Sequence, residues 1–311
     1  MARKLRVEYP GAVYHLMNRG DRREPIFLED RDRQLFLETL GETCQKTGWQ
    51  IHAYCLMNNH FHLVAETPRP NLVAGMKWFL GTYTARFNRR HKLFGHLFSG
   101  RYKSLLVDGS GTGYLKSVCD YVHLNPVRAR LIAQESDLGA YPWSSYPQYI
   151  DPAAKRPPWL RVDRLLGEHG IAKDSRAGRR EFQLRMEARR REDNLLAWKK
   201  IRRGWALGSE PFKKELLAMM HERSGPSHYG EELRQSDEEK ARTILAEELG
   251  RLRFPDLGTL SKGDPGKVRI AARLRKETAM PLSWVTQELK MGSIAYAARC
   301  LHQYGRAKGT V

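Results

Sequence analysis

The sequence predicts an α+β fold, with an antiparallel sheet and helices in its first half and an all-α region in its second. Three observations predict it. Strand-like and helical segments alternate in the order β, α, β-hairpin, α, β, α, which differs from the strict βαβα order of a parallel sheet. Asn58-Asn59 is a turn signal between two short apolar runs. Beyond about residue 158 the chain is helical and heavily charged.

The first half resembles a ferredoxin-like or RNA-recognition-like sheet in outline, with its helices on one side. Each element follows from local spacing and turn residues, because apolar residues recur at helical or strand periods between Gly, Asn and Pro positions. The predicted elements are a strand over Gly11 to Asn18, a helix over Arg31 to Thr47 that ends at Gly48, hairpin strands over Trp49 to Met57 and Phe61 to Glu66, a helix over Asn71 to His91, a strand over Ser104 to Val107 and a helix over Gly113 to Leu124.

The chain is expected to divide into three parts. Residues 1–150 form the α+β domain, residues 151–254 a charged helical connecting region that starts at a Pro-rich linker, and residues 255–311 a helical domain. In the last part Met280 to Leu289 and Ile294 to Tyr304 are short helices around a glycine-containing turn. This helix-turn-helix pattern favours DNA reading, and plain helical packing is the alternative.

The charge balance favours a polyanionic partner. Lys and Arg number 54 against 35 Asp and Glu, so the 311-residue chain carries a formal net charge of +19. No apolar run reaches the ~18–20 residues of a membrane span, and the N-terminus lacks the apolar core of a signal peptide. We therefore expect nucleic acid as the partner, no membrane, and a cytoplasmic, nucleoid-associated location. The four cysteines form no Cys-x-x-Cys pair, which disfavours zinc ribbons and redox motifs.

His60-Phe61-His62 follows the predicted hairpin turn. Side chains alternate along a strand, so both imidazoles point to one face, ~7 Å apart, and Phe61 points to the other. Two such histidines can share one divalent ion but leave it short of ligands. A pair of surface or hydrogen-bonded histidines is the alternative.

The third predicted helix holds Tyr121 and Asn125 one turn apart, on one face. An amide oxygen suits Mg²⁺ or Mn²⁺, and a tyrosine beside it is a potential nucleophile. A core aromatic residue is the alternative interpretation of Tyr121.

These motifs together resemble the single-tyrosine HUH transposases of bacteria, and more narrowly the REP-associated tyrosine transposases. The resemblance covers about residues 8 to 150, half of the chain. It rests on four stretches of the sequence: Tyr14 to Gly20, Leu56 to Val64, Gly100 to Ser104 and Asp120 to Ala129.

The resemblance implies an HUH endonuclease-like fold and a metal-dependent DNA strand transferase. His60, His62 and Asn125 map onto ligands of Mg²⁺ or Mn²⁺, and Tyr121 maps onto the nucleophile. Attack by Tyr121 on a phosphate would leave a 5′-phosphotyrosine link and a free 3′-hydroxyl. Members of the family bind single-stranded or hairpin DNA and often act as homodimers with a shared sheet.

Basic residues in the matched blocks and in the last helices are expected to contact DNA phosphates, with solvated surface charge as the alternative. His15 is expected to be structural or to support a neighbour. The candidate DNA contacts are Arg19, Arg22, Arg101, Lys103, Arg128, Arg130, Arg273, Arg275 and Arg299.

Two other functions remain open. A helix-turn-helix regulator could hold specific DNA without cutting it, but the complete set of His60, His62, Tyr121 and Asn125 favours an enzyme. An RNA-binding protein is disfavoured, because the aromatic strand signature of RNA-recognition domains is missing.

Overall fold

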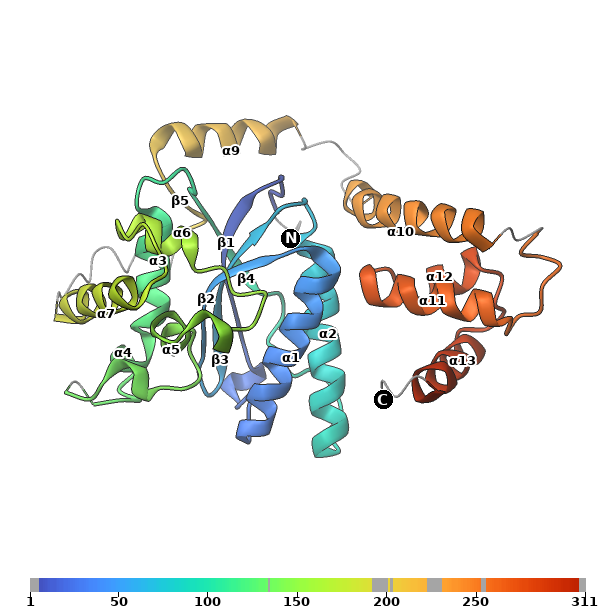
Figure 1. Ribbon diagram of the computed structural model, residues 1–311, viewed down its shortest axis with the longest axis horizontal. Helices are drawn as coiled ribbons and strands as arrows, with labels where there is room; N and C mark the ends of the chain where they lie inside the picture. Colours follow the sequence, from blue (N-terminus) through green and yellow to red (C-terminus); the bar gives the residue numbers. More distant parts are fainter. Residues whose placement is uncertain are drawn as a thin grey trace.

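The computed structural model describes residues 6–133, 135–191, 201, 204–222, 231–252 and 256–307. The first part follows the predicted order and adds one short helix (Figure 1). Its elements are β1 (Ala12–Arg19), a single 3-10 turn (Asp21–Arg23), α1 (Asp30–Thr47), β2 (Gln50–Leu56), β3 (His60–Thr67), α2 (Leu72–His91), β4 (Lys103–Val107), α3 (Tyr114–His123) and α4 (Asn125–Arg128).

The later elements are mostly short helices. They are 3-10 turns at Leu138–Ala140 and Ala153–Lys155, the helices α5 (Tyr146–Ile150), α6 (Asp163–Glu168) and α7 (Arg176–Arg191), the strand β5 (Ala206–Leu207), and the helices α9 (Glu210–Glu222), α10 (Glu231–Leu252), α11 (Pro265–Glu277), α12 (Leu282–Glu288) and α13 (Ile294–Ala307).

The sheet has five strands in the order β2-β3-β1-β4-β5. The first four are antiparallel, as in a ferredoxin-like sheet, and β5 is added parallel to β4. The α+β class with a helical C-terminal region is therefore confirmed. The expectation of a purely antiparallel sheet is wrong, because two residues from the predicted connecting region join its edge.

Helices cover both faces of the sheet, so the expectation of helices on one side is also wrong. On one face Phe61 packs against Phe36 of α1 and Phe79 of α2, with ring centroids 5.0 and 6.3 Å apart. On the other face the next residue, His62, meets Tyr121 of α3. Figure 1 shows α1 and α2 on one side of the strands and α3 with α5–α7 on the other.

Local sequence explains the two helices of the first face. Asp32 accepts hydrogen bonds from the backbone N–H groups of Leu28 and Glu29 and so caps the start of α1. Gly48 ends it with φ +78°, a left-handed conformation that favours glycine. Asn71 precedes α2 and accepts a hydrogen bond from the Trp49 indole at 2.8 Å. The predicted helix ends are therefore correct to within one residue.

Both edges of the four-stranded antiparallel part are covered by later segments of the same chain. At β2, the Ile51 N–H donates to Trp159 O and the Leu56 N–H to Trp143 O, at 3.1 and 2.8 Å. At β4, the Asp108 N–H donates to Leu207 O at 2.8 Å. Backbone groups that another strand would need are thus already paired within the chain.

The hydrophobic core around the sheet continues past residue 150. Leu165, Phe182 and Leu216 are buried in it, although all three lie in the region expected to be a connector. Phe182 of α7 stacks on Tyr149 of α5, with ring centroids 5.0 Å apart. The described part of residues 151–222 therefore packs on the sheet domain. The proposed limits of the three domains stay a prediction.

The helices α10 to α13 form a second core, which includes Ile244 of α10, Leu274 of α11 and Val285 of α12. It lies on the α1/α2 side of the sheet (Figure 1). There Lys46 of α1 donates to the backbone carbonyls of Arg275 and Lys276, and Lys240 of α10 donates to that of Glu277. Lysine ammonium groups thus cap the C-terminal end of α11, where the helix dipole is negative. Among the described residues no helix is both long and apolar enough to span a bilayer.

Candidate active site

The strand β3 presents two histidines to the α3 side of the sheet. The rings of His60 and His62 lie edge to face with centroids 5.1 Å apart. His62 is 3% exposed, whereas His60 is half-buried at the strand end. The sequence prediction that these side chains share a face is correct, and Phe61 fills the core behind them, as the alternation of strand side chains requires.

The helix α3 brings Tyr121 to the same face. Its ring centroid lies 5.7 Å from that of His62 and 5.8 Å from that of His15, and the residue is 3% exposed. Two buried polar contacts fix the helix. Asp120 bonds the Nε2 of His169 at 2.9 Å, and the Nε2 of His123 bonds the Ser145 hydroxyl at 2.8 Å. These contacts set the rotation of α3 that turns Tyr121 toward the sheet.

Each imidazole of the pair uses its Nδ1 for a hydrogen bond. The Nδ1 of His62 lies 2.9 Å from the Nε2 of His15, and the Nδ1 of His60 lies 2.8 Å from the Asn59 side-chain oxygen. Each ring therefore keeps its Nε2 for a ligand, the arrangement seen at protein metal sites, where a partner on one nitrogen orients the other. His15, expected from the sequence to be structural or to support a neighbour, bonds His62 in the structure. The register, in which Met17 lies opposite His62, places His15 on the same face of the sheet.

The three histidines are held neutral. Burial lowers the pKa of His15 to about 4. Burial, with Arg19 nearby, lowers the pKa of His60 to about 4 as well. The pKa of His62 lies well below its usual value because of burial and then the neighbouring His15 and His60. Neutral imidazole is the form that binds a metal ion, so the donor chemistry fits a divalent cation near neutral pH.

Asn125 is the first residue of α4 and is 7% exposed. Its side-chain nitrogen is buried and has no hydrogen-bond partner within the described residues. The oxygen and nitrogen of such an amide exchange places by a flip of the side chain. A buried amide with unused bonding capacity fits the third ligand proposed from the sequence. Across the described ranges, no group of three or more His, Cys, Asp or Glu is placed to hold a metal.

Three of the candidate DNA contacts lie around this face. Arg19 is opposite His60 in the β1–β3 register, and Lys103 is opposite Met17, on the face of His62. The guanidinium of Arg128 lies over the Tyr121 ring, 4.7 Å from its centroid. A cation there favours a negative charge developing near the ring.

The other candidate contacts are more scattered. Arg22, Arg101 and Arg130 are exposed on loops of the first domain. In the helical part, Arg299 is exposed on α13. Arg273 forms ion pairs with Glu247, Glu248 and Glu277, and Arg275 is half-buried. The pKa of Arg275 is lowered by that burial. Arg273 therefore has ion-pair partners inside the protein and Arg275 is partly buried, and their contact with DNA phosphates stays a prediction.

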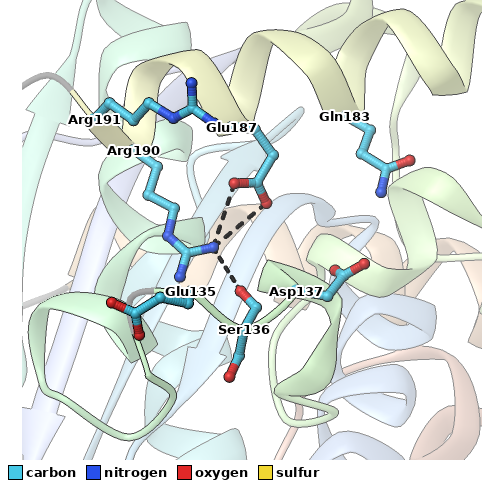
Figure 2. Close-up of a pocket in the computed structure, with 7 residues that line it drawn as sticks. All are labelled: Glu135, Ser136, Asp137, Gln183, Glu187, Arg190 and Arg191. Carbon is cyan, nitrogen blue, oxygen red and sulfur yellow. Dashed lines mark hydrogen bonds and ion pairs between the residues drawn. The ribbon is translucent and has the colours of Figure 1, made fainter.

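A pocket of about 710 Å³ lies away from these residues (Figure 2). Arg190 crosses it and bonds Glu187 and the carbonyl of Ser136. Glu135 and Asp137 add negative charge to the lining, which disfavours a nucleic-acid phosphate. None of the candidate site residues lines this pocket.

Comparisons with known proteins bear on the same segment. Residues 9–125 match the family model described as "Transposase IS200 like". The chain is also similar to a solved structure described as a REP-associated tyrosine transposase bound to a REP hairpin, with 13% identity over 52% of this chain and 92% of that one and a TM-score of 0.41. None of the curated proteins compared with the chain matches it. The matched residues 9–125, which hold His60, His62 and Tyr121, span 117 of the 311 residues, and over them the chain is similar to the IS200-like transposases.

Proposed function

We propose that the protein is a metal-dependent DNA strand transferase that cuts single-stranded or hairpin DNA through a 5′-phosphotyrosine intermediate. The observation that carries the proposal is the meeting of β3 and α3. Two neutral imidazoles with Nε2 available lie on the face that also holds the Tyr121 ring, 5.7 Å from His62. The match of residues 9–125 to a transposase family model supports a DNA-processing role.

Each residue has a role in this proposal. His60, His62 and Asn125 would hold Mg²⁺ or Mn²⁺, which when bound supplies Lewis-acid stabilisation of a phosphate oxygen. The Tyr121 hydroxyl oxygen attacks the phosphorus, the bond from phosphorus to the 3′ oxygen breaks, and that oxygen leaves as a hydroxyl. The phenol loses one proton and the leaving oxygen gains one. Arg128 over the ring stabilises the phenolate that forms.

Reversal of the first step gives strand transfer. A different 3′-hydroxyl attacks the phosphotyrosine, Tyr121 leaves, and a new phosphodiester forms. No net bond energy is lost, so no nucleotide triphosphate is needed. Arg19 and Lys103 flank the histidines and would bind the phosphates on either side of the cut.

Incubation of the protein with a labelled single-stranded hairpin DNA and Mn²⁺ tests the proposal. The expected result on a denaturing gel is a covalent protein–DNA adduct with a shortened strand bearing a 3′-hydroxyl. Binding of the hairpin without any adduct, over a range of sequences and metal concentrations, would favour the alternative of a catalytically idle DNA-binding regulator.

A further inference from the structure

The loop between α2 and β4 displays a fully exposed aromatic ring. Phe94 is 98% exposed, and Leu93 beside it is 48% exposed. The loop is nevertheless well anchored. The Asn88 side chain donates to Gly95 O, the Asp21 N–H donates to Leu97 O and the Ser99 N–H donates to Arg19 O, at 2.9–3.0 Å. The ring faces of Phe94 are therefore open to a ligand from outside the folded core.

The turn after β1 lies against the same loop and is strained. Arg22 and Arg23 have φ of +49° and +66°, a left-handed conformation that is unfavourable for a non-glycine residue. The hairpin turn before His60 holds it in place. The Asn59 side chain donates to Arg23 O at 2.9 Å, and the Gly20 N–H donates to Asn59 O at 2.9 Å. Strain of this kind is common where a backbone must aim side chains at a ligand.

The end of β1, the turn after it and the loop between α2 and β4 form a rim beside His60. The arginines of this rim differ from most of those on α1 and α2. Among the described residues Arg19, Arg22 and Arg23 form no ion pair, and neither does Arg101. Four of the five arginines on α1 and α2 are paired with carboxylates: these are Arg31 with Glu38, Arg33 with Asp30, Arg86 with Glu42 and Arg90 with Glu29. The rim next to His60 thus holds arginines that form no ion pair within the described residues, together with an exposed aromatic ring.

We propose that Phe94 and Arg23 form a binding site for an unpaired nucleotide of the substrate strand. The Phe94 ring stacks on the base, and the Arg23 guanidinium binds the adjoining phosphate. Base faces are accessible only in an unpaired strand, so this site selects single-stranded over duplex DNA. The proposal rests on the proposed function, because it identifies the strand that reaches His60.

Binding of a labelled oligothymidine, measured by fluorescence anisotropy, tests the site on the full chain. Phe94→Ala should raise Kd roughly 5- to 150-fold, the effect of losing one base–aromatic stack worth about 1–3 kcal/mol. Phe94→Trp should keep the affinity, and its added fluorescence should be quenched by the oligonucleotide. Leu184→Ala on α7 is the matched control, since Leu184 is also exposed, at 59%.

The salt dependence of oligothymidine binding tests the phosphate contact of Arg23. Arg23→Gly fits the left-handed backbone without strain and should flatten the slope of log affinity against log salt by ~0.7. Arg31→Gln, which removes a paired charge on α1, should not. Equal affinity of Phe94→Ala and the unaltered protein would overturn this site alone. If the unaltered protein bound no oligothymidine, the proposed substrate would fall as well, and the adduct assay reports on the chemistry separately.

His15 and His62 form a second arrangement, independent of the Phe94 loop. The rings of His15 and His62 are both buried, their planes differ by 14°, and their nitrogens are 2.9 Å apart. We infer that His15 is a positioning residue that holds His62 with its Nε2 toward the proposed metal. Outer partners of this type commonly contribute 10- to 100-fold to metal affinity.

Calorimetric titration with Mn²⁺ tests this role without any DNA. His15→Leu should weaken binding by roughly 10- to 100-fold, whereas His15→Asn, which keeps a hydrogen-bonding side chain, should restore part of the affinity. Thermal unfolding without metal shows whether each variant is folded. The inference fails if folded His15→Leu binds Mn²⁺ like the unaltered protein, or if folded His15→Asn binds no better than His15→Leu. Absence of Mn²⁺ binding by the unaltered protein would refute the metal site itself.

Discussion

The His62 and Tyr121 rings lie edge to face with centroids 5.7 Å apart, although one belongs to a strand of the sheet and the other to a helix across it. Both residues belong to one chain, so a single copy holds the histidine pair and the tyrosine together. The first prediction follows from this arrangement.

Tyr121→Phe should abolish the covalent protein–DNA adduct and leave hairpin affinity within about twofold. Only the hydroxyl is removed, so the ring still packs against His62 and under Arg128. The adduct is followed on a denaturing gel and affinity by anisotropy. An adduct formed by the Phe variant would show that another residue is the nucleophile.

His62→Ala should remove tight Mn²⁺ binding, because a site with three protein ligands cannot lose one without a large drop in affinity. His52 provides the control. It is fully buried on β2 but bonds Glu66 at 3.0 Å, away from the site. His52→Gln should therefore retain Mn²⁺ binding in calorimetry. Unchanged binding by a His60→Ala, His62→Ala double variant would place the metal elsewhere.

Glu66 predicts a pH dependence of stability. Burial alone would raise the pKa of this carboxyl, but the His52 hydrogen bond and the Arg164 charge outweigh it and lower the pKa to about 2. Its contribution is therefore fully present above pH ~4.5, the ordinary value, and is lost as the pH falls toward 2. Arg164 lies on α6, so the pair joins the sheet to the segment after residue 150.

Urea unfolding at pH 7 and pH 3 measures this contribution. Glu66→Gln should lower the free energy of unfolding at pH 7 by roughly 1–2 kcal/mol, a value reduced by solvent screening, and by much less near pH 2–3. Glu38→Gln, in the exposed pair with Arg31, is the matched control and should change little. An equal loss from Glu66→Gln at both pH values would contradict the assigned pKa.

Features of the fold and the site that neighbouring residues determine could be predicted from the sequence, whereas features that depend on contacts between distant segments could not. The end of α1 at Gly48 and the hairpin turn at Asn59 were predicted correctly, because neighbouring residues determine both features. The shared face of His60 and His62 follows from strand alternation alone. The convergence of Tyr121 on them required the family resemblance, since no local pattern places α3 over β3.

Other features depend on pairing between distant segments. Ala206–Leu207 is too short to show a strand period, yet it covers the edge of β4. His15 enters the site only through the register of β1 against β3. Arg273 looked like a phosphate ligand because of its charge, but α10 supplies Glu247 and Glu248 as its partners. Strand pairing, strand register and ion pairing between helices, none of which a local pattern shows, account for these three features.

The covered sheet edges predict the oligomeric state. Pairing of β2 with Trp143 and Trp159, and of β4 with β5, occupies the backbone groups that a shared sheet would use. The protein should therefore be a monomer of 35.9 kDa in light scattering after gel filtration, rather than the homodimer that the resemblance implied. A stable species of about twice that mass would mean that one edge opens or that another surface mediates the contact.

The sheet core and the helical core of α10–α13 are expected to have separate roles, the first in cutting DNA and the second in binding it. Ile244 and Leu245 place α10 in the helical core, so a cut near residue 255 would leave the apolar face of α10 uncovered. A chain that ends at residue 222 lacks the whole helical core of α10–α13. It should therefore fold and stay soluble more readily than a chain cut near residue 255. On α1 it uncovers Lys46, whose ammonium group water can solvate.

The shorter chain keeps His60, His62, Tyr121 and Asn125, together with the sheet and the helices that align them. We expect it to form the covalent adduct at saturating DNA but to bind hairpin DNA more weakly, because the exposed α13, with Arg299, is lost. Each lost phosphate contact should flatten the log–log salt dependence of affinity by ~0.7–0.9. An unchanged slope would mean that α10–α13 do not touch DNA. Loss of the adduct in a truncated protein that is still folded would mean that these helices help to build the active site, from the α1/α2 side of the sheet.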